Sequence, residues 1–207
     1  MAVDTTYITA EETIDWIRDP NPDGIDLDII EVVREATSRA IDAYCNVAHF
    51  YPDDTATARV FVPSSYDGAL NVDDFWELSS VKVDLDDDGT YEATWTAPTH
   101  FRPSPFNGLT PSGIQCGYRR IVPAYNKEWP MSRSGFPTVE VTAKWGWPEV
   151  PSAVRMAARI LASKLDYLKF ARAGVAAVGD FGPIRVQGNR DAEMLLEPLR
   201  VTRTWQV

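Results

Sequence analysis

Hydrophobic residues recur at three- and four-residue spacing in two long stretches of the chain. In an α-helix this spacing places them on one face, so each stretch predicts a long amphipathic helix that needs a partner for its apolar face. The first covers about residues 27–46 and the second about 152–172. The apolar positions are Ile30, Val33, Thr37, Ile41 and Tyr44 in the first, and Val154, Ala157, Ala158, Leu161, Leu165 and Leu168 in the second.

Local signals mark where the helices begin. Asp26 is placed to cap the first long helix, and Pro151 lies just before the second, where a proline is tolerated. Thr9 followed by Glu12 forms a capping box, which predicts a short helix over residues 10–18. A final short helix is expected at about 191–199, with Asn189 or Asp191 as its cap.

Between these helices the hydrophobic period changes from about 3.6 to 2, which is typical of strands. Turn residues separate the short β-rich runs, and residues 97–118 are rich in proline and glycine, which predicts a long surface loop. The expected strands are 58–62, 81–83, 91–95, 120–122 and 138–144.

The order of elements predicts an α+β protein: a small antiparallel helix bundle, of two long amphipathic helices plus short ones, with an inserted antiparallel β-rich unit. Four parts follow from this interpretation. The expected boundaries are 1–54 for the N-terminal helical part, 55–147 for the β-rich insertion, 148–200 for the C-terminal helical part and 201–207 for a C-terminal tail.

The net charge of −10 is distributed unevenly along the 207 residues. Residues 1–100 hold 22 acidic and 5 basic residues, whereas residues 101–207 hold 8 and 15. Such asymmetry favours partner-facing surfaces, although an ordinary acidic surface is the alternative. An acidic chain is poorly suited to grip nucleic acid by its phosphates.

No apolar window is long enough to predict a membrane span, and the N-terminus lacks a secretory-signal pattern, so we expect a cytosolic origin.

The run from Asp84 to Gly89 is the strongest candidate for metal chemistry. Asp84, Asp86 and Asp88 have the alternate spacing of a calcium loop, but the twelfth position is Trp95 instead of glutamate. The flanking segments are strands, so an Asp-Asp-Gly hairpin turn is favoured and a bound divalent cation is the alternative.

Catalytic signals are weak in the rest of the chain. The only histidines are His49 and His100, and neither lies near a recognisable nucleophile. Cys45 and Cys116 are far apart in sequence and are expected to be free thiols. We therefore predict no enzymatic activity and no cofactor. A carbohydrate-binding β module remains an alternative because tryptophans are frequent: Trp76, Trp95, Trp129, Trp145 and Trp147.

Five segments in collinear order carry a resemblance to a known family. They are YITAEETIDWIRD, AIDAYCNVAHF, VDLDDDGTYEATW, VEVTAKWGWPEVPSAVRMAARILASKL and GDFGPIRVQGNRDAEMLLEPL. Together they resemble the head-to-tail adaptors of long-tailed bacteriophages, most closely those of phages that infect actinobacteria. The resemblance implies a non-enzymatic virion protein with a small antiparallel helix bundle and a β excursion.

The resemblance also implies the assembly and its partners. Such adaptors form a closed ring of about twelve copies beneath the portal protein, a heterologous arrangement that closes by rotation. The ring joins the DNA-filled capsid to the stopper or tail-completion protein, at the virion neck, after assembly in the host cytoplasm. Passing genomic DNA is expected to be repelled by an acidic channel wall instead of being bound specifically.

Two sets of residues are candidates for contacts in such a ring. Arg155, Arg159, Trp145 and Trp147 are candidates for inter-subunit contacts, with acidic and basic halves of neighbouring copies pairing laterally. The alternating tail at 201–207 is expected to dock on the portal by strand addition, with a frayed terminus as the alternative. The docking candidates are Arg200, Arg203, Trp205 and Val207.

Overall fold

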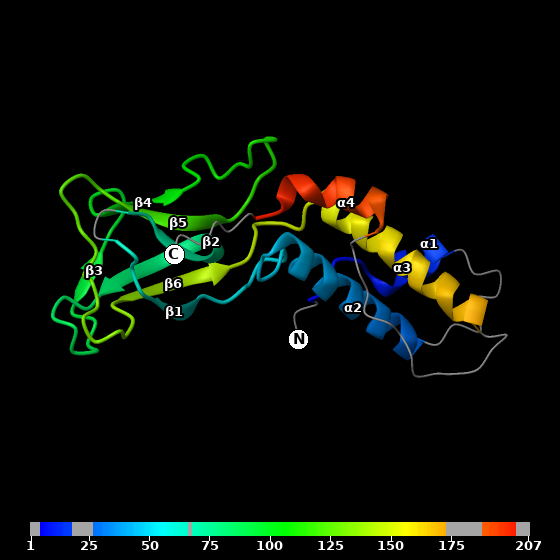
Figure 1. Ribbon diagram of the computed structural model, residues 1–207, viewed down its shortest axis with the longest axis horizontal. Coiled ribbons are helices and arrows are strands. Elements are labelled where there is room, and N and C mark those ends of the chain that lie inside the picture. Colours follow the sequence, from blue (N-terminus) through cyan, green and yellow to red (C-terminus); the bar gives the residue numbers. More distant parts are fainter. Residues whose placement is uncertain (1–4, 18–26, 66–67, 173–187, 202–207) are drawn as a thin grey trace. The chain divides into compact units, whose positions relative to one another are not determined.

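The computed structural model describes residues 5–17, 27–65, 68–172 and 188–201, and for 165–172 only the backbone. The chain divides into two compact units (Figure 1). The helical unit comprises Met1–Tyr51 and Val150–Val207, and the sheet unit comprises Pro52–Glu149. The protein is thus of mixed α+β class, with helices in one unit and an antiparallel sheet in the other.

The described part of the helical unit contains α1 (Ala10–Ile17), α2 (Leu27–Cys45), α3 (Ser152–Arg172) and α4 (Arg190–Leu196), followed by a 3-10 turn at Glu197–Leu199. Helix α3 packs against α1, α2 and α4 (Figure 1). The centre of this unit is therefore α3, instead of a symmetric pair of long helices.

Small residues on α3 explain its central position. Val154, Ala157, Ala158 and Leu161 are buried, as their spacing predicted. The small side chains of Ala157, Ala158 and the also buried Ala162 allow neighbouring helices to approach closely. The side chains of Leu165 and Leu168 lie outside the described residues. On α2 the predicted positions Ile30, Thr37 and Ile41 are buried, whereas Val33 and Tyr44 are half-buried.

Two of the predicted caps are confirmed. The Glu12 amide donates to Thr9 Oγ1 at 3.0 Å, and the Thr9 amide donates to Glu12 Oε2 at 3.0 Å, which is a complete capping box. At the start of α4, the side chain of Asn189 accepts a hydrogen bond from the amide of Ala192. The expected cap Asp26 lies outside the described residues.

The N-terminal segment before α1 is held on α2 by polar side chains. The Tyr7 amide donates to Ser38 Oγ at 3.1 Å, and Arg34 Nε donates to the carbonyl of Ile8 at 2.7 Å. The Tyr7 hydroxyl donates to Asp42, one turn beyond Ser38. These α2 residues follow one another at four-residue spacing, so one stripe of the helix orders the segment.

The sheet unit is a six-stranded antiparallel sheet with the order β1-β6-β2-β5-β4, and β3 pairs with β2 (Figure 1). The strand β2 is long, so its first half pairs with β5 and its last residues pair with β3. The bounds are β1 Thr57–Phe61, β2 Leu70–Val83, β3 Ala93–Trp95, β4 Phe101–Ser104, β5 Tyr118–Pro123 and β6 Val139–Trp145.

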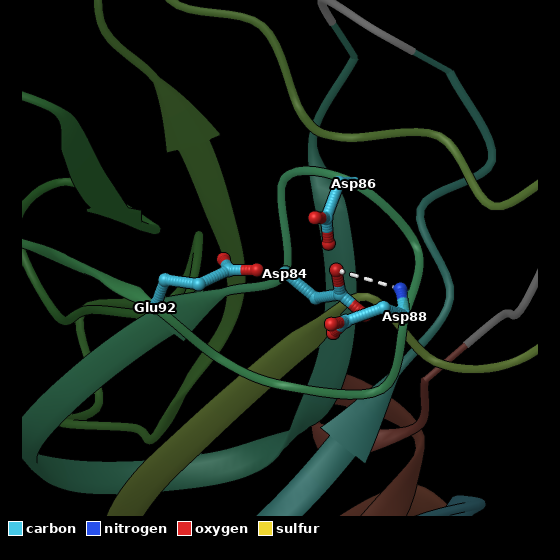
Figure 2. A group of neighbouring side chains, drawn as sticks. All are labelled: Asp84, Asp86, Asp88 and Glu92. Carbon is cyan, nitrogen blue, oxygen red and sulfur yellow. Dashed lines mark hydrogen bonds between the residues drawn. The ribbon is translucent and has the colours of Figure 1, made fainter.

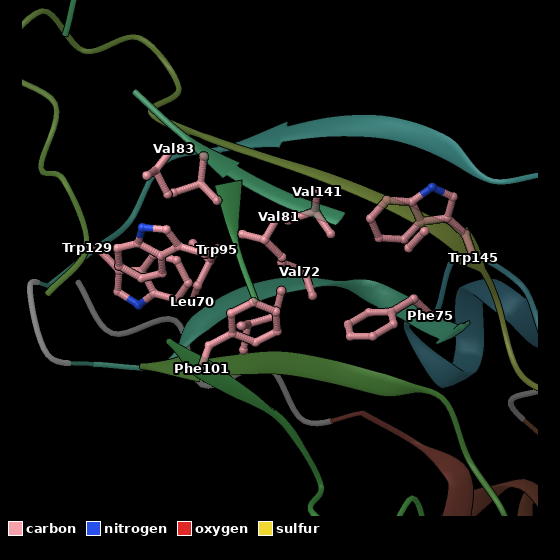
Figure 3. Close-up of a cluster of buried hydrophobic side chains, with 13 residues drawn as sticks. Leu70, Val72, Phe75, Val81, Val83, Trp95, Phe101, Trp129, Val141 and Trp145 are labelled. Atoms are coloured by element: carbon pink, nitrogen blue, oxygen red, sulfur yellow. The ribbon is translucent and has the colours of Figure 1, made fainter. Parts of the chain in front are cut away.

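One face of this sheet carries the hydrophobic core. Along β6 every second residue is buried, from Val139 to Trp145, as the alternating pattern predicted. The rings of Trp95 and Trp129 stack with centroids 4.9 Å apart (Figure 3). The stretch 97–118 differs from the expected loop because it contains β4, which pairs with β5.

Candidate functional site

The acidic run after β2 forms a turn organised around one buried carboxylate. Asp84 is 1% exposed, and its Oδ1 accepts a hydrogen bond from the amide of Asp88 at 3.3 Å (Figure 2). The amide of Asp87 also donates to Oδ1 at 2.7 Å, and the amide of Gly89 donates to Oδ2 at 2.8 Å. Asp87 and Gly89 adopt φ values of 64° and 89°, which glycine and aspartate tolerate best. The structure therefore contains the hydrogen-bonded turn that the sequence favoured.

The same turn brings four carboxylates together (Figure 2). One oxygen from each of Asp84, Asp86, Asp88 and Glu92 lies within 4.8 Å of the others. Desolvation, followed by the charges of Asp88 and Glu92, raises the pKa of Asp86. The calcium-loop pattern expects a carboxylate at its twelfth position, which here is the buried Trp95, so the sequence did not point to Glu92. Glu92 occupies the ninth position of the same pattern, and that position was the signal that could have found it.

A second carboxylate joins this turn to the loop before β6. Asp87 accepts hydrogen bonds from the amides of Arg133 and Ser134 at 2.8 and 2.7 Å, and from the Ser134 hydroxyl at 2.7 Å. These bonds to Ser134, with that from Arg133, hold the pKa of Asp87 below its usual range. We call residues 84–92 and 130–137 together the sheet-end tip.

Both indole rings expected at a subunit contact are buried. Trp145 Nε1 donates to the Thr57 carbonyl at 3.0 Å, and Trp147 Nε1 donates to Asp74 at 3.2 Å. Neither ring is exposed at all, so both contribute to the core of their own chain instead of a surface that a neighbour can touch. Trp95 and Trp129 are buried as well, which leaves these four rings unable to line a sugar-binding surface.

The two arginines expected at the same contact differ in their surroundings. Arg155 is exposed on α3. Arg159 instead donates to Glu12 Oε1 of its own chain at 2.5 Å and joins α3 to α1. The Thr9 amide, together with Arg159, holds the pKa of Glu12 below its usual range. Arg155 is therefore the member of the pair that is available to a partner.

Of the expected portal-docking residues, the structure describes Arg200. Its guanidinium lies 5.3 Å from the centre of the Tyr44 ring and 4.0 Å from Glu197. The adjacent Val201 amide donates to the Cys45 carbonyl at 2.8 Å, so the chain is still anchored on α2 at this point. Arg203, Trp205 and Val207 lie outside the described residues.

His49 and the two cysteines are of residue types that enzymes often use in catalysis, but here they are buried. His49 is buried and stacks on Tyr51 at 4.0 Å between ring centroids. Cys45 and Cys116 are buried free thiols, and burial raises the pKa of Cys45 to about 12, which disfavours the reactive thiolate. Within the described parts of the chain, the helices are too short or too polar to cross a membrane.

Solved structures with the same fold come from gene transfer agent (GTA) particles. A chain of the neck of an empty GTA particle, computed with C6 symmetry, has a TM-score of 0.58 and 19% identity, with 100% of this chain and 96% of that chain covered. A chain of the virion of a native GTA particle has a TM-score of 0.60 and 18% identity, again with 100% of this chain and 96% of that chain covered.

A chain of the neck of a native GTA particle, computed with C12 symmetry, has a TM-score of 0.53 and 15% identity, with 98% of this chain and 97% of that chain covered. At these identities the likeness establishes a shared fold that extends over both units. No protein-family model matches the chain, and no curated protein matches it.

Proposed function

We propose that this chain is a structural protein of the neck of a phage-like particle, and specifically a head-to-tail adaptor. The observation that carries the proposal is the full-length fold shared with chains of GTA particles, two of them from the neck. Because nearly the whole of each chain is covered, the likeness includes the combination of a helical unit and a sheet unit, instead of one common motif. The collinear sequence resemblance to phage adaptors points the same way.

In this proposal the chain forms a ring of about twelve copies below the portal, in line with the C12 symmetry of a related neck. The ring joins the capsid to the stopper or tail-completion protein and surrounds the channel through which genomic DNA passes. Each copy has a net charge of −10, which disfavours adhesion of phosphates to the channel wall. Residues 201–207 and Arg200 dock on the portal, and Arg155 contributes to the contact between neighbours.

Deletion of the gene from its phage tests this role. We expect DNA-filled heads without tails in electron micrographs, because the head would lack the ring on which the tail assembles. Expression of the wild-type chain from a plasmid should restore tailed particles, and purified particles should contain the chain at the neck. Tailed, infectious particles from the deletion strain would refute the proposal.

A second candidate function, divalent-cation binding, is favoured by the four carboxylates at the tip. It competes with the turn itself, because both oxygens of Asp84 already accept backbone hydrogen bonds. The test is a thermal melt of the chain with calcium in the millimolar range and with EDTA. A rise in Tm that the Asp88→Asn variant loses would support this function, and an unchanged Tm would exclude it.

A further inference from the structure

We propose that neighbouring copies contact each other through their sheet units, with the sheet-end tip of one copy docked on the outer face of β4 and β5 of the next. This inference rests on the proposed ring. The two surfaces are different parts of one unit, so the contact is heterologous, which is the type that generates rings. Because the sheet unit carries both surfaces, the contact does not depend on the helical unit.

The tip is pre-organised for docking. Asp84 fixes the turn from within, and Asp87 fixes it to Arg133 and Ser134, as described above. The Tyr91 hydroxyl adds a third link by donating to the Pro137 carbonyl at 3.2 Å. A surface whose loops are already ordered loses little conformational entropy when it binds.

The tip presents apolar groups to solvent beside its acids. Phe136 is 71% exposed and Leu85 is 62% exposed, and they belong to the two loops that Asp87 joins. Both loops lie at the end of the sheet where β2 ends and β6 begins (Figure 1). Exposed apolar side chains rimmed by charge are typical of protein-binding surfaces. The cluster of acidic side chains adds a requirement for positive charge on the partner.

The outer face of β4 and β5 supplies that positive charge. In the register of this pair, Arg102 lies opposite Val122 and Arg120 lies opposite Ser104, so the two arginines are diagonal neighbours on one face. Both are exposed. Phe106, 68% exposed, lies two residues beyond the end of β4 and adds an exposed apolar side chain at this end of the strand.

The arginine pair stands out because the other basic side chains on the strands are already paired. The intrachain ion pairs are Arg59–Asp73, Lys82–Glu140, Arg119–Asp74 and Lys144–Glu77. Among the residues that the structure describes, Arg102 and Arg120 have no hydrogen bond, ion pair or ring contact from their side chains. The sheet unit thus carries an acidic surface at the tip and a basic surface on β4 and β5, and neither is neutralised within the unit. In a second copy, the opposite surface provides the complementary charge for each.

Charge reversal in the full-length chain tests the contact. The tip variant carries Asp86→Lys and Asp88→Lys, which leaves Asp84 and Asp87 to hold the loops. The face variant carries Arg102→Glu and Arg120→Glu. Self-association is measured by sedimentation equilibrium up to about 1 mM protein, with EDTA and at low ionic strength, where charge contacts are least screened.

We expect each variant alone to associate about 10- to 100-fold more weakly than the wild type, because two attractions become repulsions. An equimolar mixture of the two variants should recover the wild-type affinity, since the lysine tip of one matches the glutamate face of the other. A control with Asp15→Lys and Glu35→Lys, on exposed positions of the helical unit, has the charge change of the tip variant and should associate as the wild type does.

Three outcomes would overturn the inference: a wild type that stays monomeric throughout the range, variants that associate like the wild type, or a mixture that recovers nothing. Circular dichroism at matched concentrations establishes that each variant is folded before it is scored. The deletion experiment on the phage remains independent. If tails are lost without the chain but the charge reversals have no effect, the adaptor role stands and this contact is wrong.

Discussion

Replacing Asp42 with asparagine should change how the stability of the helical unit depends on pH. Asp42 is 5% exposed on α2, accepts the hydroxyl of Tyr7, and lies 3.1 Å from Arg39 Nε. Burial is the main cause that raises its pKa to about 6 from an ordinary value of 3.8, and Tyr7 and Arg39 oppose that shift only in part. The Phe50 amide donates to the same Tyr7 hydroxyl at 2.9 Å, so the carboxylate supports a connected network.

The sign and size of the effect follow from the two pKa values. Because the folded chain holds this proton more tightly than the unfolded chain, Asp42 favours folding most at pH values below 3.8. That contribution is lost as the pH rises through about 6. The full shift of about two pKa units corresponds to about 3 kcal/mol in the free energy of unfolding, of which about 2 kcal/mol falls between pH 4.5 and 7.5.

Asparagine keeps an oxygen for the Tyr7 hydroxyl but does not titrate. The difference in unfolding free energy between Asp42→Asn and the wild type should therefore move by about 2 kcal/mol in favour of the variant from pH 4.5 to 7.5. Urea unfolding, followed by the circular dichroism of the helices, measures the free energy of unfolding of both proteins at each pH. The pH-dependent contributions of the other carboxylates cancel when the two values are subtracted. The exposed Asp15→Asn serves as the control. A difference that stays constant across this range would refute the reasoning.

Three further predictions concern contacts within the units. Trp145→Ala should destabilise the sheet unit by about 3–5 kcal/mol, because it empties a fully buried site; a loss below about 1 kcal/mol in urea unfolding would contradict this. Asp87→Ala should speed amide hydrogen exchange at Arg133 and Ser134, whose amides donate to Asp87, and unchanged exchange at both would mean that other contacts hold the loop. Arg159→Glu should lower stability by about 1 kcal/mol through repulsion of Glu12, and Arg159→Gln should have a smaller effect; equal losses would exclude repulsion as the cause.

The sequence was sufficient for features whose cause is local. The spacing of apolar residues predicted the long helices, now α2 and α3, and alternation predicted β6. The Thr9–Glu12 capping box was visible because its two residues are three positions apart. Each of these depends on neighbours within one or two turns, so a pattern along the chain contains the needed information.

Strand recognition failed where polar residues or prolines interrupt the alternation. The first half of β2 contains Asp73 and Asp74, and β4 contains Pro103, so neither was predicted. Both are strands because of their partners: Asp74 pairs with Arg119 on β5, and β4 is an edge strand, where a missing amide is tolerated. Tertiary pairing overrides the local preference in each case.

The candidate sites depended even more on distant contacts. The sequence pointed to Asp84, Asp86 and Asp88, but the hydrogen bonds that Asp87 accepts from Arg133 and Ser134 join segments more than forty positions apart. Arg159 donates to Glu12, 147 positions away in the sequence. Because its guanidinium is paired within its own chain, Arg159 is not available for the expected contact between subunits. Periodicity determines which face of an element is apolar, whereas register and packing decide which groups are buried or paired, because those depend on how distant segments are brought together.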